Sequence, residues 1–256
     1  MKFQVLTPSG TELPDYFTHL EPFHAAFETG LPILMYHKLR YPSFFARTKS
    51  IYLDPKLFEH HLSELSAAGF QSVSLNDELP IAGNPDRGVV ITFDDGYANV
   101  FKKGLQLLEK FKFKAIQFLV ARHIGGRNEW DIQHGELPED LMDESQIREW
   151  LAAGHHIGAH TLTHISLPDL PEAQTREEIA SSKKMLEDRF GISIEHFCYP
   201  YGKCDERTRN LVGEAGFLTA CSTVPGLNTA KTDRLKLARI STRYRSRKLK
   251  DLWLLR

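Results

Sequence analysis

The sequence is poor in cysteine, has no excess of either charge and contains no long apolar run, and each absence removes a class of protein. Its 256 residues include three cysteines, an odd number without a CxxC spacing, so we expect free thiols and a reducing compartment rather than a disulfide framework. Lys and Arg number 32 against 33 Asp and Glu, which gives no reason to expect a nucleic acid or an anionic membrane as partner. The one basic cluster, residues 239–250, is interpreted as a solvated C-terminal end, with contact to phosphate or an acidic glycan as the alternative.

No segment of the sequence resembles an export signal or a membrane span. The N-terminus lacks a basic stretch followed by an apolar one, and no run approaches the roughly 20 apolar residues that cross a bilayer. We therefore expect no membrane span and a cytoplasmic location. Residues 1–30 carry Pro14 and Pro22 without clear periodicity and are interpreted as an irregular arm with one helix near residues 16–27. Residues 31–256 are expected to form one catalytic domain, whose oligomeric state the sequence does not indicate.

From residue 31 onward, apolar strand-like runs alternate with amphipathic helical patterns. The expected strands are residues 31–37, 70–75, 88–93, 114–120, 155–159, 195–198, 217–221 and 236–240. The expected helices run from Pro55 to a closing Gly69 and over residues 98–110, 145–153, 171–190 and 206–215. Strict alternation implies parallel strands with crossover helices, hence an α/β barrel or an open sheet. The unpatterned residues 122–143 are expected to form a rim loop along a substrate groove.

Two adjacent carboxylates, Asp94 and Asp95, end the apolar strand at residues 88–93. An acidic pair before glycine is by itself a common turn signal, but burying such a pair costs several kcal/mol unless a cation or hydrogen-bond donor compensates it. His160 and His164 stand four residues apart and could share one face of a helical turn, where they would meet a carboxylate on one cation. That donor set suits zinc and leaves a coordination position for water, which distinguishes a catalytic site from a closed structural one.

Three motifs in this order are similar to those of a known family. ThrPheAspAspGlyTyr (92–97), HisThrLeuThrHis (160–164) and PheCysTyrProTyrGly (197–202) resemble the polysaccharide deacetylase family, carbohydrate esterases that share the nodulation-deacetylase homology domain. LeuMetTyrHis (34–37) and LeuLysLeuAlaArgIle (235–240) are similar to its flanking signatures. The resemblance extends over roughly residues 31–240, and as an ordered set the motifs are far more specific than any one alone.

The resemblance implies a distorted (β/α)7 barrel, with parallel strands, outer helices and a divalent metal at the carboxyl ends of the strands. The implied metal ligands are Asp95, His160 and His164, and the ion is expected to be Zn²⁺, with Co²⁺, Ni²⁺ or Mn²⁺ as alternatives. Asp94 is implied as the general base on the attacking water, and the backbone N–H of Tyr201 as an oxyanion donor. The implied reaction removes N-acetyl groups from N-acetylglucosamine-type sugars in a polysaccharide or glycan precursor.

Two positions depart from the family pattern. Cys198 stands where many relatives have an arginine that orients the base, and we hypothesise that Arg239 replaces it from the opposite side of the rim. The family often supplies a general-acid histidine from its last motif, whereas no histidine follows His196. The leaving amine is then protonated by Asp94 itself, by His37 or by water, and the sequence does not choose among them.

Substrate contacts are assigned to His37, Tyr97, Trp130 and Pro200. His37 is alternatively a core histidine, and Trp130 an anchor of its loop rather than a platform for a sugar. Two rival functions follow from the same residues: hydrolysis of small cyclic amides or imides, and a catalytically degenerate glycan-binding domain. The second is motivated by Cys198 and by the missing late histidine.

Overall fold

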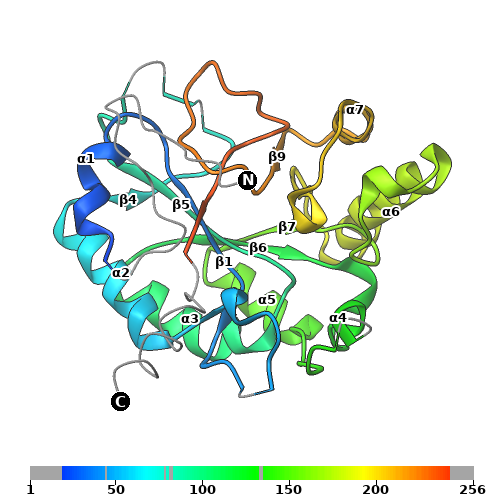
Figure 1. The fold of residues 1–256 in the computed structure, drawn as a ribbon, viewed down its shortest axis with the longest axis horizontal. Helices are drawn as coiled ribbons and strands as arrows, with labels where there is room; N and C mark the ends of the chain where they lie inside the picture. The colour runs from blue at the N-terminus through cyan, green and yellow to red at the C-terminus, as the bar shows by residue number, and fades with distance from the viewer. Residues whose placement is uncertain (1–18, 44, 78, 81–82, 133–134, 243–256) are drawn as a thin grey trace, which may run out of the picture.

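A curved sheet of parallel strands forms the centre of the computed structural model, which describes residues 19–242 except 44, 78, 81–82 and 133–134 (Figure 1). Its strands are β1 (Ile33–Tyr36), β4 (Gln71–Ser72), β5 (Gly88–Phe93), β6 (Ala115–Leu119), β7 (His156–Ala159), β8 (His196–Cys198), β9 (Thr219–Cys221) and β10 (Ile240–Ser241). The sheet runs in the order β10-β1-β5-β6-β7-β8-β9, and β4 pairs with β5 outside this path. β2 (Lys38–Leu39) and β3 (Tyr52–Leu53) form a separate small parallel pair.

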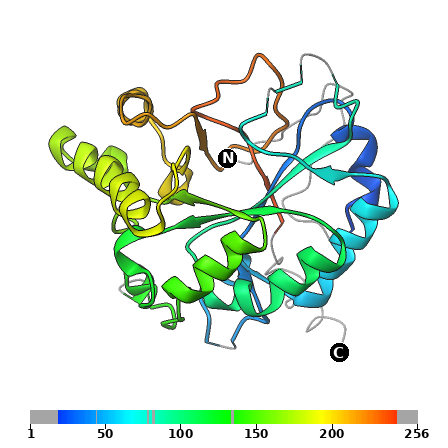
Figure 2. The same cartoon turned by 180° about the vertical axis from the view of Figure 1, so that it is seen from behind.

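Helices connect the strands and cover the outside of the sheet. They are α1 (His24–Phe27), α2 (Pro55–Ala67), α3 (Ala98–Lys110), α4 (Glu129–Ile132), α5 (Glu144–Ala152), α6 (Glu172–Phe190) and α7 (Glu206–Glu214). Single 3₁₀ turns are η1 (Glu21–Phe23), η2 (Lys49–Ile51), η3 (Ala121–His123), η4 (Leu167–Asp169) and η5 (Pro200–Gly202). Both views show α2, α3 and α5 side by side along one side of the sheet (Figures 1 and 2). α2 starts as the sequence predicts, because the Asp54 carboxylate accepts the Lys56 N–H and Pro55 occupies the first turn.

The segment that includes residues 237–241 closes the sheet into a barrel. Leu237 bridges Cys221 of β9 in parallel, with hydrogen bonds from Leu237 N to Ala220 O at 2.8 Å and from Ser222 N to Leu237 O at 2.9 Å. A few residues later, β10 pairs in parallel with β1, where Leu34 faces Ile240. The segment thus contacts β9 at one edge of the sheet and β1 at the other. Where the sequence predicts a strand over residues 236–240, the structure has the strand Ile240–Ser241. The result is a distorted (β/α)7 barrel, which confirms the expected fold class.

The strand β5 shows how the barrel positions its reactive groups. All six of its residues are buried, as expected for a parallel strand covered on both faces. Val89, Ile91 and Phe93 pack in the large core between sheet and helices, whereas Val90 belongs to a smaller interior cluster with Ile116, Phe118, Cys198 and Cys221. Because side chains alternate along a strand, Thr92 and then Asp94 continue the inner face that Val90 begins. A carboxylate is therefore delivered to the mouth of the barrel.

Several sequence expectations differ from the structure or lie outside its described part. The strand expected over residues 70–75 is shortened to β4, and the supposedly unpatterned residues 122–143 contain part of η3 and the helix α4. The start of the helix expected near residues 16–27 and most of the basic cluster at residues 239–250 lie outside the described residues. The domain boundary at residue 30 stays a prediction. No helix within the described ranges combines the length and the apolar character that crossing a bilayer requires.

Candidate active site

Asp94 and Asp95 leave the end of β5 in different directions. Both carboxylates are buried, with 2% and 5% of their residue surface exposed. Asp94 continues the inner face of the strand, whereas Asp95 has a φ of 73° and Gly96 a φ of 82°, so the backbone turns sharply between the two acids. The turn separates two like charges that are adjacent in sequence and gives each its own set of partners. They can therefore perform different tasks.

Asp95, His160 and His164 converge at the mouth of the barrel. The Asp95 Oδ1 atom lies 3.4 Å from His160 Nε2 and 3.2 Å from His164 Nε2, and all three side chains are buried. Although burial by itself would raise it, the pKa of Asp95 is held well below its ordinary value, because both imidazoles donate toward the carboxylate. The structure thus brings together the three residues that the sequence proposed as metal ligands, from β5 and from the loop after β7.

The backbone between the two histidines is not the helical turn that we expected. Thr161 and His164 both have positive φ values, 63° and 64°, so the spacing of four residues does not arise from a shared helical face. The Thr161 hydroxyl instead accepts the His164 N–H at 2.9 Å. The carboxylate of Glu178, on α6, accepts the N–H groups of Leu162 and Thr163 at 3.0 and 2.9 Å. The loop is therefore held by side-chain acceptors in place of helical hydrogen bonds.

Left-handed backbone is concentrated at this site. Asp95, Thr161, His164 and Tyr201 all have φ between 59° and 73°, a region that residues other than glycine seldom occupy. Each such residue costs on the order of 1–3 kcal/mol and persists only where the surrounding structure enforces it. Residues with this strain cluster at ligand-binding sites, where the side-chain geometry that they create is needed for function and outweighs the stability lost to backbone strain.

The donor set fits a tetrahedral divalent ion. Ligand bonds of roughly 2.0–2.1 Å at tetrahedral angles place ligand atoms about 3.3–3.4 Å apart, close to the 3.2 and 3.4 Å found here. His160 Nδ1 lies 2.7 Å from the carbonyl oxygen of Cys198, which can only accept, so Nδ1 carries a proton. A metal that displaced the proton that Nε2 donates toward Asp95 would be bound by the Nε2 lone pair. These residues can accordingly hold a metal with one fixed histidine tautomer.

The guanidinium of Arg239 donates hydrogen bonds to both carboxylate oxygens of Asp94. Its Nη1 lies 2.7 Å from Asp94 Oδ1 and its Nη2 2.8 Å from Oδ2, and Arg239 is 1% exposed. Burial would raise the pKa of Asp94, but the Arg239 charge and hydrogen bonds lower it below the ordinary value. Nη2 also contacts Cys198 Sγ at 3.1 Å. The sulfur thus stands beside the fork, and the arginine comes from just before β10.

His37 lies next to the same carboxylate, between β1 and β2 in the chain. Its Nε2 is 3.8 Å from Asp94 Oδ2, and its side chain is 22% exposed. Desolvation lowers the pKa of His37, although the charges of Asp94 and Asp95 oppose that effect. His37 is thus a rim residue beside the reactive carboxylate and not a core histidine.

A hollow of about 700 Å³ opens beside His164. Its lining residues are His123, Glu129, Trp130, Thr163, His164, Ile165, Ser166, Tyr201 and Lys203. The Trp130 ring packs at 4.7 Å from the His164 ring, and the Tyr201 ring at 4.8 Å from it. Trp130 is 7% exposed and Tyr201 47% exposed, so the tryptophan forms a wall of the hollow and the tyrosine stands at its rim. Trp130 is thus packed into the structure and lines the hollow, and its contact with a sugar stays a prediction.

Tyr97 and Pro200 are both buried, and substrate contact by either residue stays a prediction. The Tyr97 ring is 0% exposed and its hydroxyl donates to Asp131 Oδ2 at 3.2 Å, because the segment after η3 folds over it. Pro200 is buried at the start of η5, where it shapes the turn. The Tyr201 N–H, one residue later, makes no hydrogen bond within the described part of the chain and is available to a ligand.

Sequence reasoning missed the polar network beneath the rim. Lys38 is 0% exposed and pairs with Glu139 at 3.1 Å, and the Lys38 ammonium lies 4.5 Å from the centre of the Tyr97 ring. Asp131 joins this network through Tyr97, and burial followed by the Asp95 charge raises the pKa of Asp131. The only sequence signal was a lysine directly after an apolar strand. Its partner lies about 100 residues away, in a segment without periodicity.

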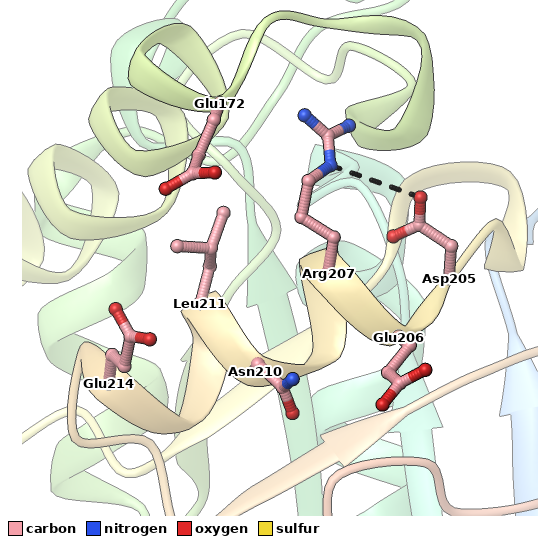
Figure 3. A pocket seen from close by; sticks show the side chains of 7 residues that line it. All are labelled: Glu172, Asp205, Glu206, Arg207, Asn210, Leu211 and Glu214. Carbon is pink, nitrogen blue, oxygen red and sulfur yellow. Dashed lines mark ion pairs between the residues drawn. The ribbon is translucent and has the colours of Figure 1, made fainter.

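A second hollow, of about 550 Å³, lies between the start of α6 and the helix α7 and shares no lining residue with the first. Figure 3 shows four carboxylates around it, with an ion pair between Arg207 and Asp205. Arg176 pairs with both Glu172 and Glu214, at 3.3 and 2.7 Å. The acidic groups are thus largely neutralised by neighbouring arginines, and no histidine joins them. This hollow is not a candidate active site.

Comparison with solved structures places the fold among deacetylase barrels. BC0361, a polysaccharide deacetylase from Bacillus cereus, superimposes with a TM-score of 0.71 at 22% identity, covering 90% of this chain and 70% of that one. At this level of identity the match establishes a shared barrel and says nothing of substrate.

Sequence comparison then gives the family. The family model for polysaccharide deacetylase matches residues 82–220, just over half of the chain, so the protein belongs to the polysaccharide deacetylase family. YxkH of Bacillus subtilis, which is named as a polysaccharide deacetylase, is 28% identical over 204 residues, 77% of this chain and 65% of YxkH. The poly-beta-1,6-N-acetyl-D-glucosamine N-deacetylase of Staphylococcus aureus MSSA476 is 23% identical over 211 residues, 74% of this chain and 70% of that protein. The chain thus spans about two thirds of the length of these relatives.

Proposed function

We propose that this chain is a metal-dependent hydrolase that removes N-acetyl groups from N-acetylglucosamine-type sugars of a polysaccharide or glycan precursor. The observation that carries the proposal is the convergence of Asp95, His160 and His164 beside an arginine-clamped Asp94. Family membership and the name of the Staphylococcus aureus relative support the choice of an N-acetylated glycan. The cytoplasmic location expected from the sequence stays a prediction, which cell fractionation would test.

Asp95, His160 and His164 would hold the metal. A bound divalent ion, Zn²⁺ foremost and Co²⁺, Ni²⁺ or Mn²⁺ as alternatives, supplies Lewis acidity, lowers the pKa of water to roughly 7 and polarises an acetyl carbonyl. The neutral His160 tautomer, fixed by the Cys198 carbonyl, keeps a lone pair directed at this position. The rings of Trp130 and Tyr201 both pack against the His164 ring.

Asp94 would take the proton of the attacking water. Its neighbour Asp95 is engaged by two histidines, whereas both oxygens of Asp94 accept hydrogen bonds from Arg239. The Arg239 fork fixes the plane of the Asp94 carboxylate, so the lone pair used for proton transfer has one orientation. Arg239 is in this view a positioning residue for the base.

The acetyl carbonyl becomes a tetrahedral oxyanion when the water adds to it. The N–H of Tyr201, which makes no hydrogen bond within the described residues and lies in a turn with a left-handed φ of 59°, would donate to that oxygen. Loss of one such donor typically costs on the order of 10²–10³ in rate, so the turn is a substantial part of the proposed machinery.

Collapse of the tetrahedral species breaks the C–N bond, and the departing amine needs a proton. Asp94 holds the proton taken from water, and His37 lies 3.8 Å from it on the partly exposed side of the site. We propose that Asp94 passes this proton to His37, and that His37 donates a proton to the departing amine. The position left without a late histidine is thereby filled from β1.

Two sets of observations argue against the rival functions. The glycan-binding hypothesis rested on Cys198 and on a missing histidine, yet Arg239 clamps the base and His37 stands beside it. A small cyclic amide would fit a narrow enclosed pocket, whereas the hollow beside His164 has an exposed tyrosine at its rim, which suits a sugar chain.

Acetate release tests the proposal. Chito-oligosaccharides, β-1,6-linked N-acetylglucosamine oligomers, peptidoglycan fragments and lipid-linked N-acetylglucosamine would be incubated with the protein and added Zn²⁺, Co²⁺ or Ni²⁺. We expect release from at least one glycan, its loss with a chelator and its loss in Asp94→Asn. Release at the parent rate by Asp94→Asn would remove the mechanism. Hydrolysis of cyclic imides without any release from glycans would favour the rival reaction.

A further inference from the structure

Two histidines and a glutamate meet on the outer surface and share no residue with the proposed active site. His60 and Glu64 lie one helical turn apart on α2, and His19 reaches them from the segment before η1. His19 Nδ1 is 2.8 Å from His60 Nε2, and each of these nitrogens is 3.0 Å from Glu64 Oε1. Figure 1 shows the start of the described chain, with α1, lying against α2.

Hydrogen bonds alone do not satisfy these three atoms. Each of the two nitrogens faces both the other nitrogen and the same carboxylate oxygen, so three close contacts share the available protons. If both nitrogens carry hydrogen, the 2.8 Å contact sets donor against donor. If only one does, the second nitrogen turns a lone pair toward the carboxylate oxygen at 3.0 Å. A cation at the centre removes the conflict, because it accepts all three lone pairs at once.

The surroundings of Glu64 leave one oxygen for this purpose. Its Oε2 accepts the backbone N–H of Leu20 at 2.6 Å, which fixes the carboxylate and directs Oε1 toward the histidines. The glutamate side chain is 13% exposed, whereas His19 and His60 are 59% and 44% exposed. The Glu64 carboxylate is therefore held in place by Leu20, and the two histidines are open to the solvent from which an ion and its water would arrive.

We propose that His19, His60 and Glu64 form a second divalent-metal site, distinct from the one at the barrel mouth. Two imidazoles and one carboxylate are the donors of borderline ions such as Zn²⁺, Co²⁺ and Ni²⁺, and water completes the coordination shell. The pair at i and i+4 on α2 resembles other helical two-ligand arrangements in that both donors lie on one face. This site does not depend on the proposed reaction.

Such an ion would act as a cross-link. Leu20 is 0% exposed and belongs to the main hydrophobic core, so the segment that carries His19 is already attached at one point. Binding of a metal by His19 adds a second attachment to α2. Since a ligand that binds only the docked arrangement shifts the equilibrium toward it, the segment before η1 becomes more resistant to opening when zinc is present.

Zinc stoichiometry of the full chain tests the site. After dialysis against a zinc buffer, metal analysis should give about two equivalents in the unaltered protein and about one in His60→Gln and in Glu64→Gln. His156→Gln is the matched control, because His156 is exposed and lies on β7 outside the cluster, and it should retain about two. His164→Gln should retain about one, and His60→Gln combined with His164→Gln about none.

Limited proteolysis supplies a readout that does not involve activity. Zinc should slow cleavage of the segment around residue 19 in the unaltered protein and in His156→Gln, and should have no effect in His60→Gln. His19→Gln repeats the test with a change outside α2, should His60→Gln fold poorly. Only one equivalent in the unaltered protein, or two in both His60→Gln and His19→Gln, would overturn the proposal. Failure of acetate release with two equivalents still bound would refute the proposed function and leave this site intact.

Discussion

Replacement of Arg239 by alanine tests the least expected feature of the site. The guanidinium makes a two-pronged contact with Asp94 and further hydrogen bonds to Ser222 O and Thr92 Oγ1, all of them buried. Removing one member of a buried ion pair leaves the other charge without compensation, which typically costs about 3–5 kcal/mol. For a chain of this size the melting temperature should fall by roughly 10 °C. Because Arg239 orients the base from behind, turnover should fall by roughly 10–100-fold.

The pH profile separates the catalytic effect of Arg239 from a loss of stability. Arg239 lowers the pKa of Asp94 against the opposing effect of burial. The stability that this shift contributes is present above the unfolded pKa of about 3.9 and is lost as pH falls through the folded pKa. In Arg239→Ala burial is opposed only by the charges of His37 and His160, so the pKa of Asp94 rises. The acid limb of kcat/KM in acetate release should therefore move to higher pH.

Two further variants of arginine make this prediction refutable. Arg239→Lys keeps the charge and loses the fork, so it should keep the acid limb closer to that of the parent than alanine does while still losing turnover. Arg234→Ala, on the same segment, removes contacts to the carbonyl groups of Leu75 and Asp77 and should leave the limb where it is. Undiminished turnover in Arg239→Ala, or an acid limb that does not move, would show that the fork does not orient the base.

The remaining predictions concern the ligands, the proton donor and the oxyanion turn. Asp95→Asn should abolish acetate release and lose one metal equivalent, measured by metal analysis; full metal content would remove Asp95 from the ligand set. His37→Gln should lower kcat by roughly 10²-fold with little change in KM, and steady-state kinetics that show only a raised KM would instead make it a substrate contact. Tyr201→Gly keeps the left-handed turn and the N–H, so kcat should be retained while KM rises; a large loss of kcat would mean that the phenol takes part in the reaction.

The strand that carries the carboxylates could be predicted because its pattern is local. Residues 88–93 form an uninterrupted apolar, β-branched run, and the structure has β5 over the same six residues. The conformation between His160 and His164 could not be predicted, since Thr161, a β-branched residue, is a poor candidate for positive φ. What holds it there is Glu178, which reaches the loop from another element. The spacing of four residues is compatible with a helical turn, but the hydrogen bonds from the loop to Glu178 hold a different backbone conformation.

Contacts between remote segments explain the other differences. Tyr97 is the last residue of the motif and is therefore expected in the pocket, but Asp131 and the segment around it cover the ring. That segment has no periodicity from which its position could be predicted. Arg239 could be hypothesised only because Cys198 left the base without a partner. Its distance from Asp94 of 145 positions along the chain is bridged by barrel closure, which no pattern within either segment encodes.

The arginine clamp and the role of base make opposing demands on Asp94. A carboxylate whose pKa is lowered by Arg239 is well oriented but holds a proton weakly, so a proton taken from water has to move on quickly. His37 lies 3.8 Å away, and desolvation lowers its pKa, so it is neutral at pH 7 and has a ring nitrogen free to accept. In the proposed mechanism, a weakly basic acceptor next to a neutral imidazole can pass a proton from water to the leaving group without storing it. The clamp therefore gives Asp94 its orientation, and the imidazole compensates for the basicity that the clamp removes.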